Sequence, residues 1–403
     1  MSGDTVTKLV LDRAGDEPVC LFAYDLDALT EHVRRVVASL PERCRMFYAM
    51  KANSAAPVLR ALAPVVAGFD AASGGEVDKV RAVAPDAVIA LGGPAKSPQA
   101  ISGALAQGVT RFHAESELDL ARISEAARRS GRTAEVLLRV NLEGPFPTAT
   151  LAMAGRPTQF GISEAGLPAA VALARELPAI RLTGFHLHSL SNNLSAQAHL
   201  DLLDLYRRKV TGWEHEFGLS CEVLNVGGGV GVNYADLDAQ FDWPGFADGL
   251  AALVESFPAH WREIAFECGR YLTAFCGYYA AEVLDVKTNH GEHYAILRGG
   301  THHFRLPSSW QHNHPFTVVE VDGWPLPHAR PEHAGRPVTV TGELCTPKDV
   351  LARNVPVERV RAGDVLLFSH AGAYGWDISH HDFLSHPHPE RVFVSAGGEL
   401  ADP

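Results

Sequence analysis

The chain is short of lysine, of positive charge and of long apolar runs. Seven lysines stand against 28 arginines, and 47 acidic residues bring the formal net charge to −12. Without a basic stripe to neutralise phosphates, the sequence argues against a nucleic-acid partner. No apolar run approaches the roughly 20 residues that a membrane-spanning helix needs. We therefore expect neither nucleic acid nor membrane among its partners.

Cysteine is also scarce and is not arranged for disulfides or metals. The six cysteines (20, 44, 221, 268, 276 and 345) form no CxxC pair and no metal-ligand spacing. The first residues, Met1–Lys8, contain no apolar signal-peptide core. We expect reduced thiols, a cytoplasmic location and no metal site.

Apolar strand-like runs alternate with amphipathic helical segments over the first two thirds of the chain. The helical segments include Leu26–Ser39, Ser116–Arg129, Glu164–Glu176 and Ala196–Glu216. Eight such runs over about 240 residues predict a (β/α)8 barrel. An open doubly wound sheet is the alternative, but it would normally carry a glycine fingerprint after its first strand. The runs lie near residues 46–50, 65–71, 87–91, 110–115, 135–141, 181–188, 222–227 and 263–267.

The pattern changes near Leu272, where helical periodicity fades and short strand-like pieces take over. We predict an α/β plus all-β protein: a barrel over residues 26–272 and a C-terminal β-barrel or β-sandwich domain over 273–403. The stretch Leu9–Tyr24 alternates like a strand, so residues 1–25 are expected to join the β-domain. The predicted pieces are Tyr279–Lys287, Tyr294–Leu297, Phe316–Val321, Pro337–Thr341, Asp364–Ser369 and Arg391–Ser395.

One lysine closes the first apolar run, in Phe47-Tyr-Ala-Met-Lys51-Ala-Asn53. An amine at the end of a buried strand is expected to be partly desolvated, which lowers its pKa toward the nucleophilic form. Such a lysine can form a Schiff base with an aldehyde cofactor. The alternative is a strand-end lysine that extends to solvent.

Other polar residues fall at the ends of later runs, where a (β/α)8 barrel carries its chemistry. Backbone N–H groups of a glycine triplet can approach a phosphate, although such triplets also form ordinary turns. A carboxylate can keep a pyridine nitrogen protonated, and it could instead pair with a nearby arginine. A histidine could stack on the pyridine ring of such a cofactor. These residues are Asp70, His188, Ser191, Gly227–Gly229, Glu267, Gly269 and Arg270.

Together these motifs resemble the fold-type III pyridoxal phosphate (PLP) decarboxylases, the group of ornithine, diaminopimelate and arginine decarboxylases. The resemblance runs from the Lys51 segment to Gly372-Ala-Tyr374. It implies that Lys51 carries PLP, that His188 stacks on its ring and that Glu267 pairs with the pyridine nitrogen. It also assigns the phosphate to a further set of residues: Ser191, Gly228, Gly229, Arg270 and Tyr374.

The segment Cys345-Thr-Pro-Lys-Asp349 matches the CxxxD element of the diaminopimelate type. In that family the cysteine enters the active site from the other subunit and acts after carbon dioxide has left. The resemblance therefore implies a homodimer with shared active sites. Two departures stand out: Gln159-Phe-Gly161 replaces Lys-Phe-Gly, and Cys268 replaces the usual proline of Glu-Pro-Gly-Arg.

Several long stretches are similar to one branch of the family, which acts in staphyloferrin B-type siderophore biosynthesis. That branch converts citryl-L-2,3-diaminopropionate to citryl-diaminoethane with release of carbon dioxide. The similarity implies a small citrate-conjugated substrate for this chain. The stretches are Gly144–Thr150, Met153–Gly161, Gly231–Leu237, Ser309–Phe316 and Ile378–Glu390.

A citryl group brings two further carboxylates and a hydroxyl, so its site needs donors beyond those that hold PLP. Arginine can grip a carboxylate with two hydrogen bonds, and histidine can donate one or carry charge. Most loop histidines, taken singly, are surface or packing residues. The candidates for substrate binding are Arg305, His302, Gln311, His312, Asp349 and His381.

Three other functions stay open on the sequence. A diaminopimelate or ornithine-type decarboxylase would act on a free diamino acid, which Gln159 and the histidine-rich loops disfavour. A non-catalytic PLP carrier would lack the second domain and the Cys345–Asp349 element. A racemase is disfavoured because alanine racemase places arginine, not a carboxylate such as Glu267, at the ring nitrogen.

Overall fold

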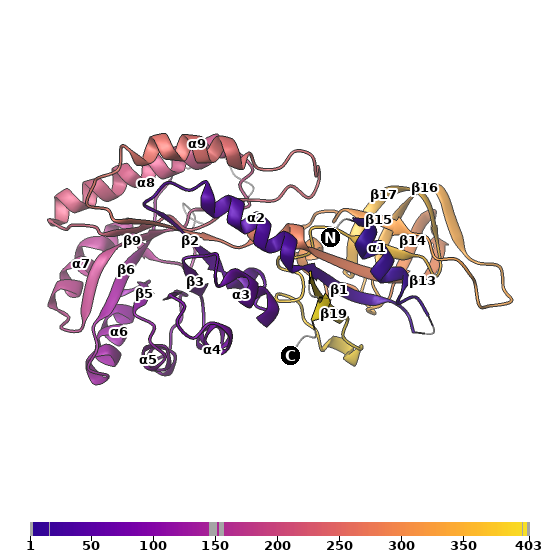
Figure 1. Cartoon of the computed structure of the whole chain (residues 1–403), viewed down its shortest axis with the longest axis horizontal. Coiled ribbons are helices and arrows are strands. Elements are labelled where there is room, and N and C mark those ends of the chain that lie inside the picture. Colours follow the sequence, from indigo (N-terminus) through magenta and orange to yellow (C-terminus); the bar gives the residue numbers. More distant parts are fainter. Residues whose placement is uncertain (1–2, 16, 145–150, 153–156, 397, 401–403) are drawn as a thin grey trace. The chain divides into compact units, whose positions relative to one another are not determined.

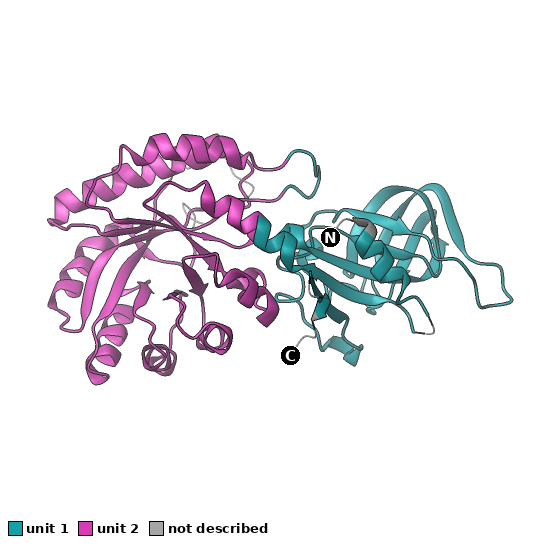
Figure 2. Cartoon of the chain, viewed as in Figure 1, with its two compact units in different colours: residues 1–31, 233–239, 273–403 teal, residues 32–232, 240–272 magenta. Residues whose placement is uncertain are grey.

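The computed structural model describes residues 3–15, 17–144, 151–152, 157–396 and 398–400. The chain forms two compact units, coloured separately in Figure 2. Unit 1 contains residues 1–31, 233–239 and 273–403, and unit 2 contains residues 32–232 and 240–272. Within the described ranges, no helix combines the length and apolarity that crossing a membrane would demand.

Unit 2 is built on eight parallel strands that close into a barrel (Figure 1). They follow the order β5-β4-β3-β2-β12-β11-β9-β6, and pairing of β5 with β6 closes the ring. Most strand residues are buried on both faces, as expected for a parallel sheet enclosed by helices. The predicted barrel is thus confirmed. Its strands are β2 (Cys44–Ala49), β3 (Gly68–Ala71), β4 (Ile89–Leu91), β5 (Arg111–Ala114), β6 (Ala134–Asn141), β9 (Ile180–Leu187), β11 (Val223–Asn225) and β12 (Glu263–Cys268).

The register of three adjacent strands determines which side chains share one rim. Tyr48 of β2 pairs with Cys268 of β12, and Ala49 of β2 pairs with Asp70 of β3. Because the strands are parallel, their carboxyl ends meet at the same edge. The residues that follow β2, β3 and β12 are therefore neighbours.

Helices alternate with these strands along the chain, and most begin at a hydrogen-bonded cap. Serine side chains accept a backbone N–H at the starts of α4, α5, α6 and α8, which stabilises each helix by about 1 kcal/mol. Helix α8 ends at Gly218, whose left-handed φ of 59° suits glycine. The helices are α2 (Leu26–Ala38), α3 (Ala56–Leu62), α4 (Gly74–Val83), α5 (Pro98–Ala106), α6 (Glu117–Arg129), α7 (Leu167–Glu176), α8 (Ala196–Phe217), α9 (Trp243–Val254) and α10 (Arg270–Thr273).

Unit 1 is mostly sheet, which confirms the all-β part of the predicted fold class. Its strands follow the order β17-β16-β14-β13-β1-β19-β20, and β18 pairs with both β13 and β15. A short helix, α11 (Leu306–Trp310), was not predicted. The strands are β1 (Cys20–Asp25), β13 (Gly277–Asn289), β14 (Glu292–Leu297), β15 (Phe316–Val319), β16 (Glu332–Thr341), β17 (Val350–Arg361), β18 (Val365–Phe368), β19 (Glu390–Ser395) and β20 (Gly398–Leu400).

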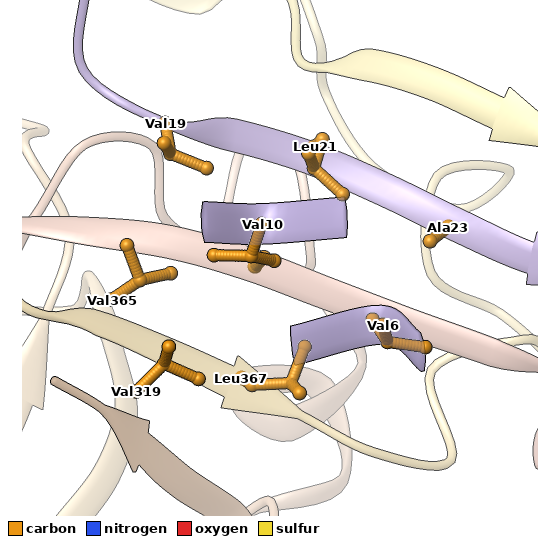
Figure 3. Packing of buried hydrophobic residues seen from close by; sticks show 9 residues of the cluster. Val6, Val10, Val19, Leu21, Ala23, Val319, Val365 and Leu367 are labelled. Atoms are coloured by element: carbon orange, nitrogen blue, oxygen red, sulfur yellow. The ribbon is translucent and has the colours of Figure 1, made fainter. Parts of the chain in front are cut away.

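The N-terminal segment was predicted as one strand over Leu9–Tyr24, and this was wrong for its first part. Gly3–Leu11 form helix α1, and the strand β1 begins only at Cys20. Val6 and Val10 are one helical turn apart, and both are buried in the apolar cluster drawn in Figure 3. Burial of this helical face against β1, β15 and β18 outweighs the local alternation.

Strand β17 was missed because its sequence is mixed. It carries three arginines and Pro356, and a proline within a run argues against a central strand. The strand lies at the edge of the sheet, where Pro356 stands opposite Pro337 of β16. An edge position tolerates both the prolines and the charges.

Candidate active site

Lys51 lies on a short turn that follows β2 directly. The 3-10 turn Met50–Ala52 carries it, and its Nζ lies 3.6 Å from Oδ2 of Asp70. A Cβ on Gly269 would come within 2.8 Å of both the Ala49 oxygen and the Ala52 Cβ, so only glycine lets the end of β12 pack against this turn. The Lys51 side chain is 49% exposed, and the expected partial desolvation of its amine stays a prediction.

Glu267 is buried at the end of β12 among polar side chains from other strands. Nδ2 of Asn225 donates to its Oε1 at 2.6 Å, and Nε2 of His186 lies 3.2 Å from its Oε2. Burial favours the neutral acid, but the nearby His186 and His113 imidazoles and Lys51 outweigh it and hold the pKa of Glu267 well below its usual range. The carboxylate is therefore ionised at neutral pH.

The sequence analysis missed the residues that surround this carboxylate. His113 and His186 are buried, their ring centroids are 4.3 Å apart, and Nδ1 of His113 lies 3.6 Å from Oε1 of Glu267. Neither Nδ1 atom has a hydrogen-bond partner within the described part of the chain. Polar residues inside otherwise apolar strands, in Arg111-Phe-His-Ala114 and Val223-Leu-Asn225, were the available signal.

These three groups are also close enough to share a cation. One ligand atom from each of His113, His186 and Glu267 lies within 4.8 Å of the others, and all three residues are buried. The neighbouring strand end carries Lys51, which suits an aldehyde cofactor. That these three groups form one wall of a cofactor site stays a prediction.

The glycine loop after β11 packs closely against the strand ends. Gly228 donates its N–H to Nδ1 of His188 at 3.1 Å, so Nε2 carries the proton of the neutral ring. A Cβ on Gly228 would lie 2.1 Å from the Glu267 carbonyl oxygen. Burial, then Lys51 and Arg139, lower the pKa of His188 well below its usual range, so the ring is neutral.

The loop offers one backbone donor for an anion. The Gly228 N–H is taken by His188, whereas no acceptor for the Gly229 N–H occurs among the described residues. Ser191 lies on the short strand β10 (Leu190–Ser191), and Arg270 is buried at the start of α10. The predicted contacts of these residues with a phosphate stay predictions.

The segment Gln159-Phe-Gly161 is held by a buried ion pair. Arg139 donates to Glu115 at 2.8 Å and lies 4.7 Å from the centre of the Phe160 ring. The second Glu115 oxygen accepts the Gly161 N–H at 2.9 Å. Two parts of the stretches that suggested the siderophore branch, residues 145–150 and 153–156, lie outside the described residues.

Asp70 gives the site a pH dependence. Burial first, and then the Glu267 charge, raise the pKa of Asp70 to about 7, while Lys51 opposes the shift. Between pH about 4 and about 7 the folded chain keeps a proton that the unfolded chain releases. Stability therefore falls as the pH rises through this window.

We expect Asp70→Asn to remove this loss. Between pH 5 and pH 8, the unfolding free energy of the cofactor-free variant should rise by about 1 to 3 kcal/mol relative to that of wild type. Urea unfolding at several pH values measures it. Asp78→Asn, on the exposed face of α4, is the control and should run parallel to wild type. If the difference in unfolding free energy between Asp70→Asn and wild type does not change with pH, the raised pKa of Asp70 is contradicted.

The remaining predicted residues belong to unit 1. Cys345 is exposed, and Tyr374 is half-buried with a left-handed φ of 55°. The two oxygens of Asp349 accept the N–H groups of Thr301 (2.7 Å) and Leu344 (2.9 Å). These bonds indicate that Asp349 fixes the loop that carries Cys345, and its contact with substrate stays a prediction.

The structure does not gather the predicted substrate residues in one place. Gln311 and His312 line a common cavity, and Arg305 is exposed. His302 is fully buried, with Nε2 3.6 Å from Glu343. His381 donates from Nε2 to the Trp376 carbonyl, and its ring stacks on the Trp376 indole ring. As contacts with substrate, all five stay predictions.

Comparison with known proteins identifies the family of this chain. Residues 26–274 match the pyridoxal-binding domain of the pyridoxal-dependent decarboxylases. The chain belongs to this family. It is 47% identical over 383 residues to the 2-[(L-alanin-3-ylcarbamoyl)methyl]-2-hydroxybutanedioate decarboxylase of Staphylococcus aureus, covering 95% of this chain and 96% of that relative. It is 29% identical to the L-glutamyl-[BtrI acyl-carrier protein] decarboxylase of Niallia circulans, covering 93% of this chain and 89% of that relative.

Solved structures share the fold of this pyridoxal-dependent decarboxylase. Diaminopimelate decarboxylase from Helicobacter pylori complexed with L-lysine has a TM-score of 0.81 at 22% identity, covering 94% of this chain and 92% of that chain. The enzyme from M. jannaschii in complex with L-lysine has a TM-score of 0.83 at 23% identity, covering 98% and 90%. At these identities the likeness shows the fold alone.

The residues present fit pyridoxal phosphate. Lys51 offers an amine for the aldehyde, and ionised Glu267 offers an acceptor for a pyridinium proton. The Gly229 N–H lacks an acceptor among the described residues, which suits a phosphate oxygen. These groups match the aldehyde, the ring nitrogen and the phosphate of the cofactor that the family uses.

Proposed function

We propose that this decarboxylase acts on citryl-L-2,3-diaminopropionate and releases carbon dioxide and citryl-diaminoethane in siderophore biosynthesis. The observation that carries the proposal is the 47% identity, over 95% of the chain, to a decarboxylase whose name describes this substrate. The glycine loop, Lys51 and Glu267 supply the cofactor chemistry that removal of an α-carboxylate needs.

The proposed roles follow the strand ends. Lys51 would hold the cofactor covalently, and Asp70 lies 3.6 Å from its amine. Neutral His188 stacks on the ring. A larger set of residues is proposed to hold the phosphate: Ser191, Gly228, Gly229, Arg270 and Tyr374. For Gly228 this contact requires its N–H to leave His188.

When bound, the cofactor supplies a pyridine ring that draws electrons away from the α-carbon of the amino acid. Glu267 keeps the proton on the ring nitrogen because its own pKa is held low and Asn225 fixes its orientation. Cys345, or a water that it positions, returns a proton to the α-carbon after the carboxylate has left. Lys51 then releases the amine product.

We further propose a cytoplasmic homodimer with shared active sites. The motif Cys345–Asp349 supports it by resemblance, and the exposed Cys345 thiol with its loop fixed by Asp349 suits a residue that reaches another subunit. In this arrangement Lys51 and Cys345 of one site come from different chains.

Mixed dimers test the shared site. Lys51→Ala and Cys345→Ala should each lower turnover, the cysteine variant by about 10²-fold or more while it still binds PLP. A dimer with one chain of each kind has one site with both residues intact. Co-expressed and purified with two tags, it should regain about half of wild-type turnover. Activity no higher than in the two parent variants would contradict sharing.

The substrate is tested by carbon dioxide release from the PLP-loaded protein. Citryl-L-2,3-diaminopropionate, meso-diaminopimelate, lysine and ornithine are compared side by side. We expect turnover of the citryl conjugate alone, because lysine and ornithine offer no carboxylate beyond the one that is removed, and meso-diaminopimelate offers a single further one without the citryl hydroxyl. Comparable turnover of a free diamino acid would favour the diaminopimelate or ornithine-type alternative.

A further inference from the structure

Unit 1 contains a cavity that the cofactor site does not use. Its volume is about 570 Å³, and it lies against α11 and the first residues of β17. Apolar atoms of Pro307 and of Val350–Ala352 form part of its wall. The polar part of its lining consists of Ser308, Gln311, His312, Asn313, Lys348 and Arg353.

The lining is positively charged and contains no carboxylate. Lys348 and Arg353 are exposed, and neither head group has an acidic partner among the residues that the structure describes. Other arginines of the same unit are paired, for example Arg298 with Glu343 at 2.7 Å and Arg330 with Asp364 at 3.1 Å. Two cations in a hollow without a counter-charge favour an anionic ligand.

Hydrogen bonds fix the polar wall before any ligand arrives. The Asn313 side chain donates to the Arg353 carbonyl at 2.9 Å and accepts the Arg353 N–H at 2.8 Å. Nε2 of His314 donates to the Ser369 carbonyl at 2.7 Å, because a carbonyl can only accept. In the neutral His314 ring Nδ1 is then an acceptor, so Nε2 of His312, 3.2 Å away, donates to it.

Two segments far apart in the sequence meet at this wall. The Tyr234 ring stacks on His312 with centroids 4.7 Å apart and contacts His314 at 5.0 Å. Tyr234 belongs to Gly231–Leu237 and His312 to Ser309–Phe316, two of the stretches that set this chain apart from general diamino-acid decarboxylases. The cofactor chemistry leaves both stretches unexplained, and their meeting at a cationic cavity gives them a common role.

We propose that this cavity binds a small anion with two or more carboxylates, either the citryl end of the substrate or free citrate. Lys348 and Arg353 neutralise the carboxylates, and the side chains of Ser308 and Gln311 add neutral donors. Lys348 belongs to the same Cys345–Asp349 element that is proposed to enter a shared site. The substrate alternative rests on the proposed function, whereas the binding of a polycarboxylate does not.

The test removes the two cations and keeps the side-chain size. Lys348→Met/Arg353→Gln is compared with Lys287→Met/Arg336→Gln, which makes the same charge change at exposed positions of β13 and β16. Citrate and acetate are titrated calorimetrically into the PLP-loaded proteins, and KM and kcat are measured with citryl-L-2,3-diaminopropionate. Circular dichroism confirms that each protein is folded.

We expect citrate affinity to fall about tenfold or more in the cavity variant, with little change in the control and weak acetate binding throughout. A parallel rise in KM, with kcat within about threefold, identifies the citryl group as the occupant. Loss of citrate binding with KM unchanged identifies free citrate.

If the citrate affinity and the KM of the Lys348→Met/Arg353→Gln variant match those of the control variant, the proposal is overturned. Wild-type protein that binds citrate but does not turn over the citryl conjugate would contradict the proposed function and leave the cavity assignment intact. The two inferences can therefore fail separately.

Discussion

Replacing Lys51 with alanine should lower carbon dioxide release by about 10⁴-fold or more. Lys96, also in unit 2, cannot replace it, because its side chain is 3% exposed and donates to two carbonyls beside Asp119. The variant should lose the visible absorption of bound cofactor, since the covalent link is gone. Turnover and absorbance of the purified protein measure both effects.

Lys79→Ala is the matched control for this loss. Lys79 lies on α4 of the same unit and donates to Ser54 at 2.7 Å, without contact to Asp70 or Glu267 in the described residues. Its turnover should stay within about twofold of wild type, as for a surface substitution. Lys51→Ala protein that is folded and still retains the visible absorption and most of the rate would contradict the assignment of the cofactor lysine.

Glu267→Gln should lower turnover by about 10²- to 10³-fold while the protein still binds PLP. A glutamine can accept the hydrogen bond from Asn225, but it cannot hold a proton on the ring nitrogen as a carboxylate does. The cofactor remains because the proposed phosphate contacts lie on other residues. PLP content and kcat measured on the same preparation separate the two effects.

Glu263→Gln makes the same chemical change on the same strand. Glu263 pairs with Arg111 at 2.6 Å at the opposite end of β12, so the change should cost at most about 1 kcal/mol of stability and leave kcat within about twofold. A full rate in Glu267→Gln would remove the argument that this carboxylate selects decarboxylation.

The rim of the barrel could be predicted because each of its residues interrupts a local pattern. Lys51 and Glu267 end apolar runs, and Gly227–Gly229 mark a turn, so strand order alone brings them to one edge. The neighbours of Glu267 could not be predicted in the same way. His113 and His186 lie within strands, and their approach to one carboxylate depends on the curvature of the closed barrel.

Less of unit 1 could be predicted from its sequence, because long-range strand pairing decides its structure. Edge position stabilises β17 despite Pro356, and burial of Val6 and Val10 makes α1 a helix. The histidine-rich loops show the same limit. Buried His302 and cavity-lining His312 look alike in sequence, and only packing separates them.

The most direct test of the central claim uses citryl-L-2,3-diaminopropionate labelled with carbon-13 at its α-carboxylate, in deuterium oxide. We expect wild-type, PLP-loaded protein to release labelled carbon dioxide and to form citryl-diaminoethane with one deuterium at the former α-carbon. Label that stays in the substrate while the α-carbon takes up deuterium would indicate racemisation. A substrate that remains unchanged would contradict the proposed reaction outright.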